Sequence, residues 1–239
     1  MQSTASSSHS DYLRFIYNAA LHVNVMADDV LVNIASRNLW PGQWHPNGFA
    51  TFEVANIVDT GLVRLHVWPR KYRPALRGHP PIHNHGFQLF SRVLAGEYVE
   101  TQYSNNPCDW AGLSRSAQRL SQYVVAAADG TGEDTVSETG AKDLVMVTAS
   151  GLRSPAGTSH ALEAGQFHST PIPLGGMCAT LAVLSPRIEG RIDVLYGRPG
   201  FQSNRRARLA VNRDEWKIIQ SQVLENMAVA PKPTRANIV

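Results

Sequence analysis

Residues 81–103 read PIHNHGFQLFSRVLAGEYVETQY, and this stretch decides the fold class. It opens with His83 and His85, continues with an apolar run, reaches a turn signal at Gly96, and then alternates between apolar and polar residues. Side chains two positions apart on a strand point to the same face, so the two imidazoles can bind one metal ion. The stretch therefore predicts two strands joined by a turn, the first opened by a pair of candidate metal ligands.

The same period of two recurs on both sides of this stretch. Residues 49–58 and 62–68 read as two strands around a tight turn, and further short strands are predicted at 144–148, 158–162 and 179–184. Regular short strands separated by glycine-containing turns favour a sandwich or a closed barrel. The sequence thus predicts an all-β fold.

Apolar spacing becomes helical near both ends of the chain. Residues 11–40 have the spacing of two helices, with Asp28 and Asp29 between them as a cap for the second. The breakers that follow, over 40–48, predict a loop. Asn212 begins a third helical pattern as its N-cap residue, followed by early acids.

These changes of pattern divide the chain into three parts. Residues 1–47 form an N-terminal tail and helical segment that packs on a barrel, residues 48–211 form the barrel, and residues 212–239 form a short helix and tail. Within the barrel, residues 104–122 read as an exposed excursion and residues 126–140 as a polar hairpin or loop. The two ends, 1–10 and from 228 onward, are expected to be loose.

Composition narrows the classes of function. The 239 residues are 43% hydrophobic and only 17% charged, with a net charge of +3, which favours a large core and argues against disorder and nucleic-acid binding. No apolar run is long enough to span a bilayer, and the polar start does not resemble a secretion signal. The two cysteines, Cys108 and Cys178, cannot form a disulfide framework, so we expect a cytoplasmic protein.

A third metal ligand is available from one of two matching turns. Both His160 and His168 follow a glycine by three positions, in the pattern of a tight turn that delivers a histidine onto a strand. We favour His168, because its distance along the chain suits a strand that returns as a hairpin into 179–184. His160 stays as the alternative ligand, as a residue lining the cavity or as an ordinary strand residue.

The histidines and the glycine that follows them resemble the motifs of the cupin superfamily. Its first motif is Gly-x5-His-x-His-x3,4-Glu-x6-Gly and its second is Pro-x-Gly-x2-His. Gly78 precedes His83 one residue closer than that pattern, and Gly96 closes the first motif. Leu89 stands where most cupins carry the glutamate, which is similar to the cysteine dioxygenase-type cupins, the thiol dioxygenases. The likeness covers residues 49–103 well and 155–186 moderately.

This resemblance implies a cupin barrel, also called a jelly roll or double-stranded β-helix, with Fe(II) held by three histidines. It implies a dioxygenase that oxidises a small polar molecule, such as a thiol or carboxylate, with O₂. No arginine stands at Ala55 or Asn56, where the family holds the carboxylate of cysteine, so cysteine itself is a doubtful substrate. Cupins often pair, so we also expect a homodimer.

The residues themselves leave the metal and the reaction class open. Imidazole ligands suit Fe, Ni, Cu and Zn alike, and Mn is also compatible with the site. Three histidines leave coordination positions for substrate, so the same site supports a redox-neutral lyase or isomerase. A cupin that binds a small molecule without turnover is the third possibility. No nucleic-acid or membrane partner is expected.

The strand over 62–68 supplies the candidate catalytic residues. Arg64, His66 and Trp68 share one face by the period of two. If this face lines the barrel interior, Arg64 can hold a substrate anion and His66 can act as an acid or base, or orient a ligand. The opposite arrangement, with Leu65 and Val67 inside, fits the pattern equally well.

Other polar residues near the motifs have weaker signals. Gln88 could be an oxygen ligand or hydrogen-bond a ligand, although an ordinary strand residue is the simpler interpretation. Tyr98 and Tyr103 are candidate hydroxyl groups near the cavity, and Arg92 has the wrong parity to face it. A cluster of arginines near the end of the barrel reads as a solvated or interface patch, formed by Arg198, Arg205, Arg206 and Arg208.

Overall fold

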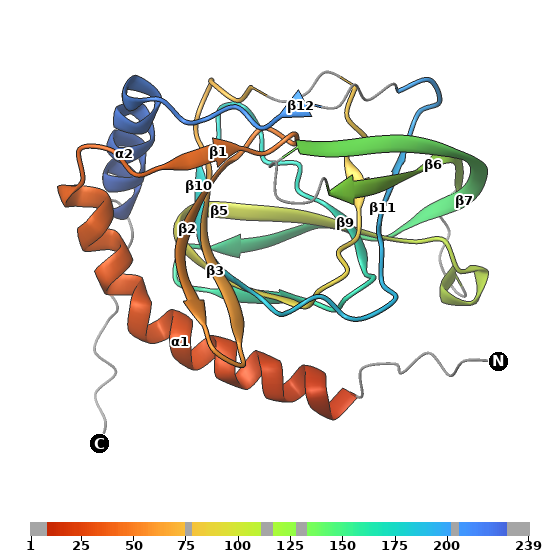
Figure 1. Cartoon of the computed structure of the whole chain (residues 1–239), viewed down its shortest axis with the longest axis horizontal. Helices are drawn as coiled ribbons and strands as arrows, with labels where there is room; N and C mark the ends of the chain where they lie inside the picture. The colour runs from red at the N-terminus through yellow and green to blue at the C-terminus, as the bar shows by residue number, and fades with distance from the viewer. Residues whose placement is uncertain (1–8, 75–77, 111–116, 128–132, 202–205, 229–239) are drawn as a thin grey trace.

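Two helices, one 3₁₀ turn and twelve strands appear in the computed structural model, which describes residues 9–74, 78–110, 117–127, 133–201 and 206–228 (Figure 1). Strands account for 45% of the described residues. In chain order the elements are α1 His9–Ser36, β1 Gly42–Trp44, β2 Ala50–Ile57, β3 Gly61–Trp68, β4 Ile82–His83, β5 Leu89–Ser104, η1 Pro107–Trp110, β6 Gln118–Ala127, β7 Glu133–Pro155, β8 Ser159–Leu162, β9 Phe167–Ser169, β10 Cys178–Leu184, β11 Asp193–Gly197, β12 Arg206–Ala207 and α2 Arg213–Ala228.

The mostly β character and the helical ends agree with the sequence, but α1 is one helix and not two. Its buried residues keep a spacing of three or four straight through the predicted break, whereas Asp28 and Asp29 are exposed. Carboxylates on the solvent side of a helix do not interrupt it, so the prediction of a cap there was wrong. The buried residues of α1 are Phe15, Ala19, Val23, Ala27, Val30 and Ile34.

The loop predicted over 40–48 contains the short strand β1, which pairs with β2. Of the predicted excursion over 104–122, Ser104 still belongs to β5, η1 follows, and β6 begins at Gln118. Residues 1–8, 111–116 and 229–239 and Arg205 lie outside the described residues. Of the ends predicted to be loose, residues 9–10 begin α1 and Ala228 ends α2. Of the predicted hairpin or loop over 126–140, residues 126–127 end β6 and residues 133–140 begin β7, and these two strands pair antiparallel. Residues 128–132 lie outside the described residues.

The strands pair antiparallel in two groups that share β5 (Figure 1). The first group runs β1-β2-β3-β10-β5, with β8 also on β5. The second group runs β9-β4-β11-β6-β7-β12, and both β9 and β7 pair with β5. The long strand β5 therefore holds the two groups together.

The sequence predicted a turn at Gly96, and this prediction was wrong. β5 continues through the glycine, which has a φ of 72° and pairs with Cys178 of β10. From Glu97 onward the strand pairs with β7 instead. A Cβ atom at position 96 would lie 1.9 Å from the backbone oxygen of Met177, so only glycine allows this kink and close approach. The turn signal thus marks the point where one strand passes between the two groups.

Both helices are in contact with the main apolar core. Val63, Leu65 and Val67 of β3 are fully buried in this core together with the inner residues of α1. Trp216 of α2 is also fully buried and meets the ring of Phe52 on β2. The other face of β3, which carries Arg64 and His66, is consequently directed away from this core.

α2 begins as the sequence predicts. The Asn212 side-chain oxygen accepts hydrogen bonds from the backbone N–H groups of Asp214 and Glu215, each at 3.0 Å. The Glu215 carboxylate accepts a hydrogen bond from the Asn212 backbone N–H at 2.9 Å, which completes a capping box. In the described part of the chain no helix has the length and apolarity required to cross a bilayer. Cys108 is exposed and Cys178 is buried, and neither forms a disulfide.

Candidate metal centre

A cavity of about 900 Å³ lies between the two groups of strands. Its volume is at the upper end of the range found for small-molecule sites. Seven of the nine histidines of the sequence line it, together with three arginines. The lining histidines are His45, His66, His79, His83, His85, His160 and His168, and the arginines are Arg64, Arg187 and Arg208.

Three of these histidines converge on one point. His83 lies on β4, His85 follows that strand, and His168 lies on β9, opposite His83 in the β4–β9 pairing. One ring nitrogen of each lies within 4.8 Å of the corresponding nitrogens of the other two. The ring centroids are 4.3 to 5.1 Å apart. This arrangement can hold one metal ion.

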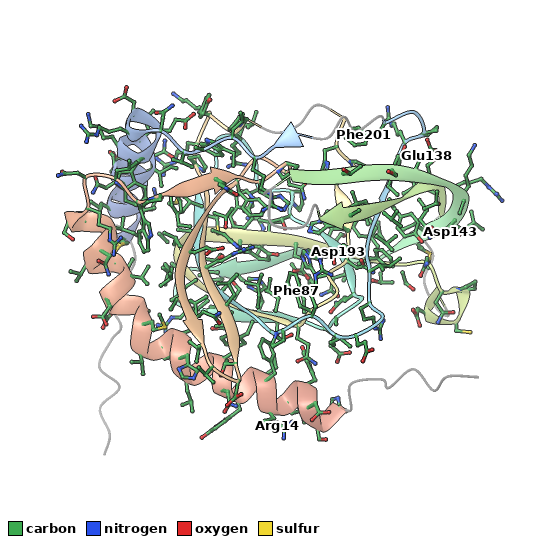
Figure 2. All side chains as sticks on the ribbon, in the orientation of Figure 1. Arg14, Phe87, Glu138, Asp143, Asp193 and Phe201 are labelled. Carbon is green, nitrogen blue, oxygen red and sulfur yellow. The ribbon has the colours of Figure 1, made fainter. Side chains whose placement is uncertain are left out.

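Backbone contacts fix the segment that carries the pair of histidines. Asn84 connects this segment to β11 through two hydrogen bonds with Val194. The backbone N–H of Asn84 donates to the carbonyl oxygen of Val194 at 3.1 Å, and the side-chain oxygen of Asn84 accepts from the backbone N–H of Val194 at 2.7 Å. The carboxylate of Asp193 accepts a hydrogen bond from the backbone N–H of Gly86 at 2.7 Å. The imidazole of His85 stacks on the ring of Phe87, with the centroids 4.7 Å apart. Figure 2 shows Phe87 and Asp193 in the same central region of the molecule.

The protonation of the three histidines suits metal binding. The Nδ1 atom of His83 lies 3.1 Å from the carbonyl oxygen of Pro81, which can only accept, so Nδ1 carries the proton and Nε2 keeps its lone pair. Burial lowers the pKa of His83, and burial with the neighbouring imidazoles lowers the pKa of His85 and His168 well below the usual value. All three rings are therefore neutral at neutral pH, the form that binds a metal.

His168, and not His160, completes this group, as the sequence favoured, but the reason given for it was wrong. The strand of His168 pairs with β4 and β5 and not with β10. His160 lies on β8 and stacks on Tyr98, with ring centroids 3.9 Å apart. It lines the same cavity, and burial lowers its pKa to about 4.

Arg64 and His66 both line the cavity, which decides between the two orientations of β3 that the sequence left open. Arg64 pairs with Glu53, its neighbour across the β2–β3 pairing, at 3.0 Å. The Glu53 side chain is 70% exposed and that of Arg64 only 27%. The Nε atom of Arg64 is buried and has no hydrogen-bond partner among the described residues. Burial, and next the charge of Arg64, lowers the pKa of His66 to about 3.

The sequence patterns did not place Arg208, Arg187 or His45 in the cavity. Arg208 lines the cavity, so the interpretation as part of a solvated or interface patch was wrong for this residue, whereas Arg198 is exposed. Arg187 also lines it, in an ion pair with Asp193. His45 accepts a hydrogen bond at Nδ1 from the backbone N–H of Asn47 at 3.2 Å, so its proton lies on Nε2. All three come from segments without periodicity, and no signal in the sequence assigns them to the cavity.

The remaining candidates lie as follows. Gln88 is buried but lines a second, smaller pocket with Asp11 and Arg14, away from the three histidines.

Tyr98 lines the cavity and its hydroxyl donates to Glu100 at 3.2 Å. Tyr103 is not among the cavity residues, and its hydroxyl bonds that of Ser169 at 3.0 Å. Arg92 hydrogen-bonds Asn24 of α1, so it faces away from the cavity as its parity predicted.

No model of a known protein family matches this chain, and no curated protein is significantly similar to it. A sheet-rich fold with a buried group of three histidines is compatible with a cupin metalloprotein.

Proposed function

We propose that this protein is a mononuclear metal-dependent enzyme of the cupin type, and that it is a non-haem Fe(II) dioxygenase. One observation carries the proposal: three neutral, converging histidines stand in a cavity large enough for a substrate. Within the described residues no carboxylate joins that group of potential ligands. A three-histidine set leaves coordination positions for other molecules.

Fe(II) bound by His83, His85 and His168 would supply the redox chemistry for the reaction of O₂ with a substrate. The chain's own residues would select and hold that substrate. Arg64 and Arg208 line the cavity beside His66, since both charges contribute to lowering its pKa. Guanidinium groups favour carboxylates and other oxyanions, so we propose an organic anion as substrate.

His66 has a distinct role in this proposal. It is neutral at neutral pH because its pKa is lowered to about 3. A neutral imidazole has one nitrogen that donates and one that accepts a hydrogen bond. His66 would therefore orient a polar group of the substrate beside Arg64, and its low basicity argues against a role as general base.

The proposal is tested first by metal analysis of protein purified without oxygen. We expect about one equivalent of Fe(II) per chain, and loss of most of it in the His83→Ala and His168→Ala variants. His160→Ala is the matched control, because this half-buried histidine lines the same cavity outside the converging group, and this variant should keep its metal. Retention of metal in a variant lacking both His83 and His85 would place the ion elsewhere.

The reaction class is tested by O₂ uptake of the iron-loaded protein with a panel of thiols and small organic acids. A dioxygenase consumes O₂ together with one of these compounds. Substrate conversion that continues at the same rate under strict anaerobiosis would instead identify a redox-neutral lyase or isomerase. Metal binding with no conversion of any compound would favour a binding protein.

A further inference from the structure

The outer face of α1 carries an apolar ridge that the fold does not bury. Leu13, Tyr17, Leu21, Val25 and Val32 follow one another at intervals of four or seven residues, and each side chain is at least half exposed. Residues four or seven apart lie on the same side of an α-helix. The buried residues of α1 lie on the opposite side, against the main core. The helix is thus apolar on both faces.

An exposed apolar ridge of five residues on one helix face is a candidate contact surface. Single exposed apolar residues are normal, but contiguous apolar surface marks an interaction site. The charges of α1 argue against a lipid surface: the described helix contains Asp11, Asp28 and Asp29 but only one arginine and no lysine. Helices that lie on membranes are rich in basic residues on the polar face. The ridge therefore suits a protein partner.

The positions of charge on the same face are self-complementary. Arg14 precedes the central part of the ridge and Asp28 follows it, each seven residues from Leu21. Figure 2 labels Arg14 on the N-terminal half of α1, where its largely exposed side chain borders the small pocket that also contains Gln88. Among the described residues Arg14 forms an ion pair with the nearby Asp11 at 2.7 Å, and the two side chains are 74% and 49% exposed. Such an exposed local pair is weak and can exchange for another.

We propose that α1 is the contact surface of a homodimer, in which the helices of two copies pack antiparallel around a twofold axis at Leu21. In this register Leu21 meets Leu21 of the partner subunit, and Tyr17 meets Val25 of the partner subunit. Arg14 then lies opposite Asp28 of the partner subunit. A parallel pair would instead place Asp28 against its own copy, which is unfavourable.

The size of the contact is compatible with a stable but modest dimer. The helix has 28 residues, which corresponds to about 42 Å at 1.5 Å per residue. Two helices of that length that lie side by side bury on the order of 1,200 Å², the lower limit for specific interfaces. The dimer is therefore expected to dissociate on dilution. This inference is independent of the metal site and of the proposed reaction.

The test is the oligomeric state of the full chain, measured by sedimentation or light scattering over a wide range of concentrations. We expect a dimer in equilibrium with monomer, and Leu21→Glu should raise the dissociation constant at least about tenfold. Leu144→Glu is the matched control, because this leucine is 43% exposed on β7, far from α1 in sequence, and faces Arg119 across the β6–β7 pairing. It should leave the dissociation constant unchanged.

Charge reversal tests the register and guards against a misfolded variant. Arg14→Glu and Asp28→Arg should each weaken the dimer, and the double variant should restore it, because the two charges again oppose each other across the axis. A chain that is monomeric at every concentration would overturn the proposal. So would a dimer that is insensitive to Leu21→Glu, or single charge variants that the double variant does not rescue. Binding of the monomer to anionic vesicles through this ridge would also overturn it.

Discussion

Arg64 keeps its charge in the cavity with a partner that lies largely in solvent. A guanidinium cannot lose its proton, so a partly buried one requires an anion. Glu53 supplies this charge at 3.0 Å, but it leaves the buried Nε atom unpartnered among the described residues. This Nε atom can therefore donate a hydrogen bond to a second anion that approaches from the cavity.

Replacement of Arg64 by glutamine tests this role. We expect the KM for an anionic substrate to rise by an amount equivalent to about 1.5–3 kcal/mol, the range for hydrogen bonds to charged groups, while the metal content stays unchanged. Glu53→Gln is the matched control, and it should leave KM equal or lower because the guanidinium loses its competing carboxylate. An unchanged KM in the Arg64 variant would exclude the contact.

The sequence singled out His83 and His85 as a pair, but its prediction that both open one strand was wrong. Only His83 lies on a strand, β4, and His85 belongs to the segment between β4 and β5. The third histidine was harder to predict, because His160 and His168 both follow turns of the same pattern. Only the pairing of β9 with β4, which places His168 opposite His83, distinguishes them. Arg208 and His45 were unpredictable for a different reason. They lie in segments without a period, and long-range packing alone brings them to the cavity.

At the scale of single elements, the glycine at position 96 of β5 was recognised as a special backbone position but interpreted as a turn instead of a kink within a strand. Glycine with a positive φ is typical of turns, but it also allows a kink inside a strand. The sequence around Gly96 cannot distinguish these cases, because the deciding contact is the backbone of Met177, far along the chain. Asp28 and Asp29 misled in the same way, since a cap and an exposed helix position use the same residue types.

Gly96→Ala should be strongly destabilising. The added methyl group would meet the Met177 backbone oxygen at 1.9 Å, in addition to the cost of a left-handed conformation. Gly151→Ala is the matched control, because its φ is 65° and nothing lies within 4 Å of an added Cβ. In urea unfolding we expect a loss of about 1–2 kcal/mol for the control and of at least about 4 kcal/mol for Gly96→Ala. If both variants lost the same free energy of unfolding, the contact with the Met177 backbone would not contribute to the cost of Gly96→Ala.

At the scale of the whole molecule, the buried histidines couple folding to pH. Burial lowers the pKa of His160 to about 4 and that of His66 to about 3, whereas the unfolded chain binds protons with the usual pKa of about 6.5. Above pH 6.5 both residues are neutral in both states, so their full contribution to stability is present. Below it only the unfolded state takes up protons, until the pH reaches the folded values. Stability should therefore fall as the pH drops from about 6.5 to about 4 and below.

The metal-free protein is the material for this test. Between about pH 7.5 and pH 5 its free energy of unfolding should decrease, and His160→Gln should reduce that decrease by about 2 kcal/mol, since one such histidine contributes about 1.4 kcal/mol per pH unit. A His160 variant with an unchanged slope would contradict the prediction.

The sharing of β5 by both groups of strands has a consequence for how the molecule comes apart. Its first half pairs with β10 and β8, and its second half pairs with β7 and β9. Neither group can therefore be released while the other remains intact, because the same backbone completes both. Unfolding should proceed as a single cooperative step, and the amide protons of β5 should be among the slowest in the chain to exchange with deuterated solvent.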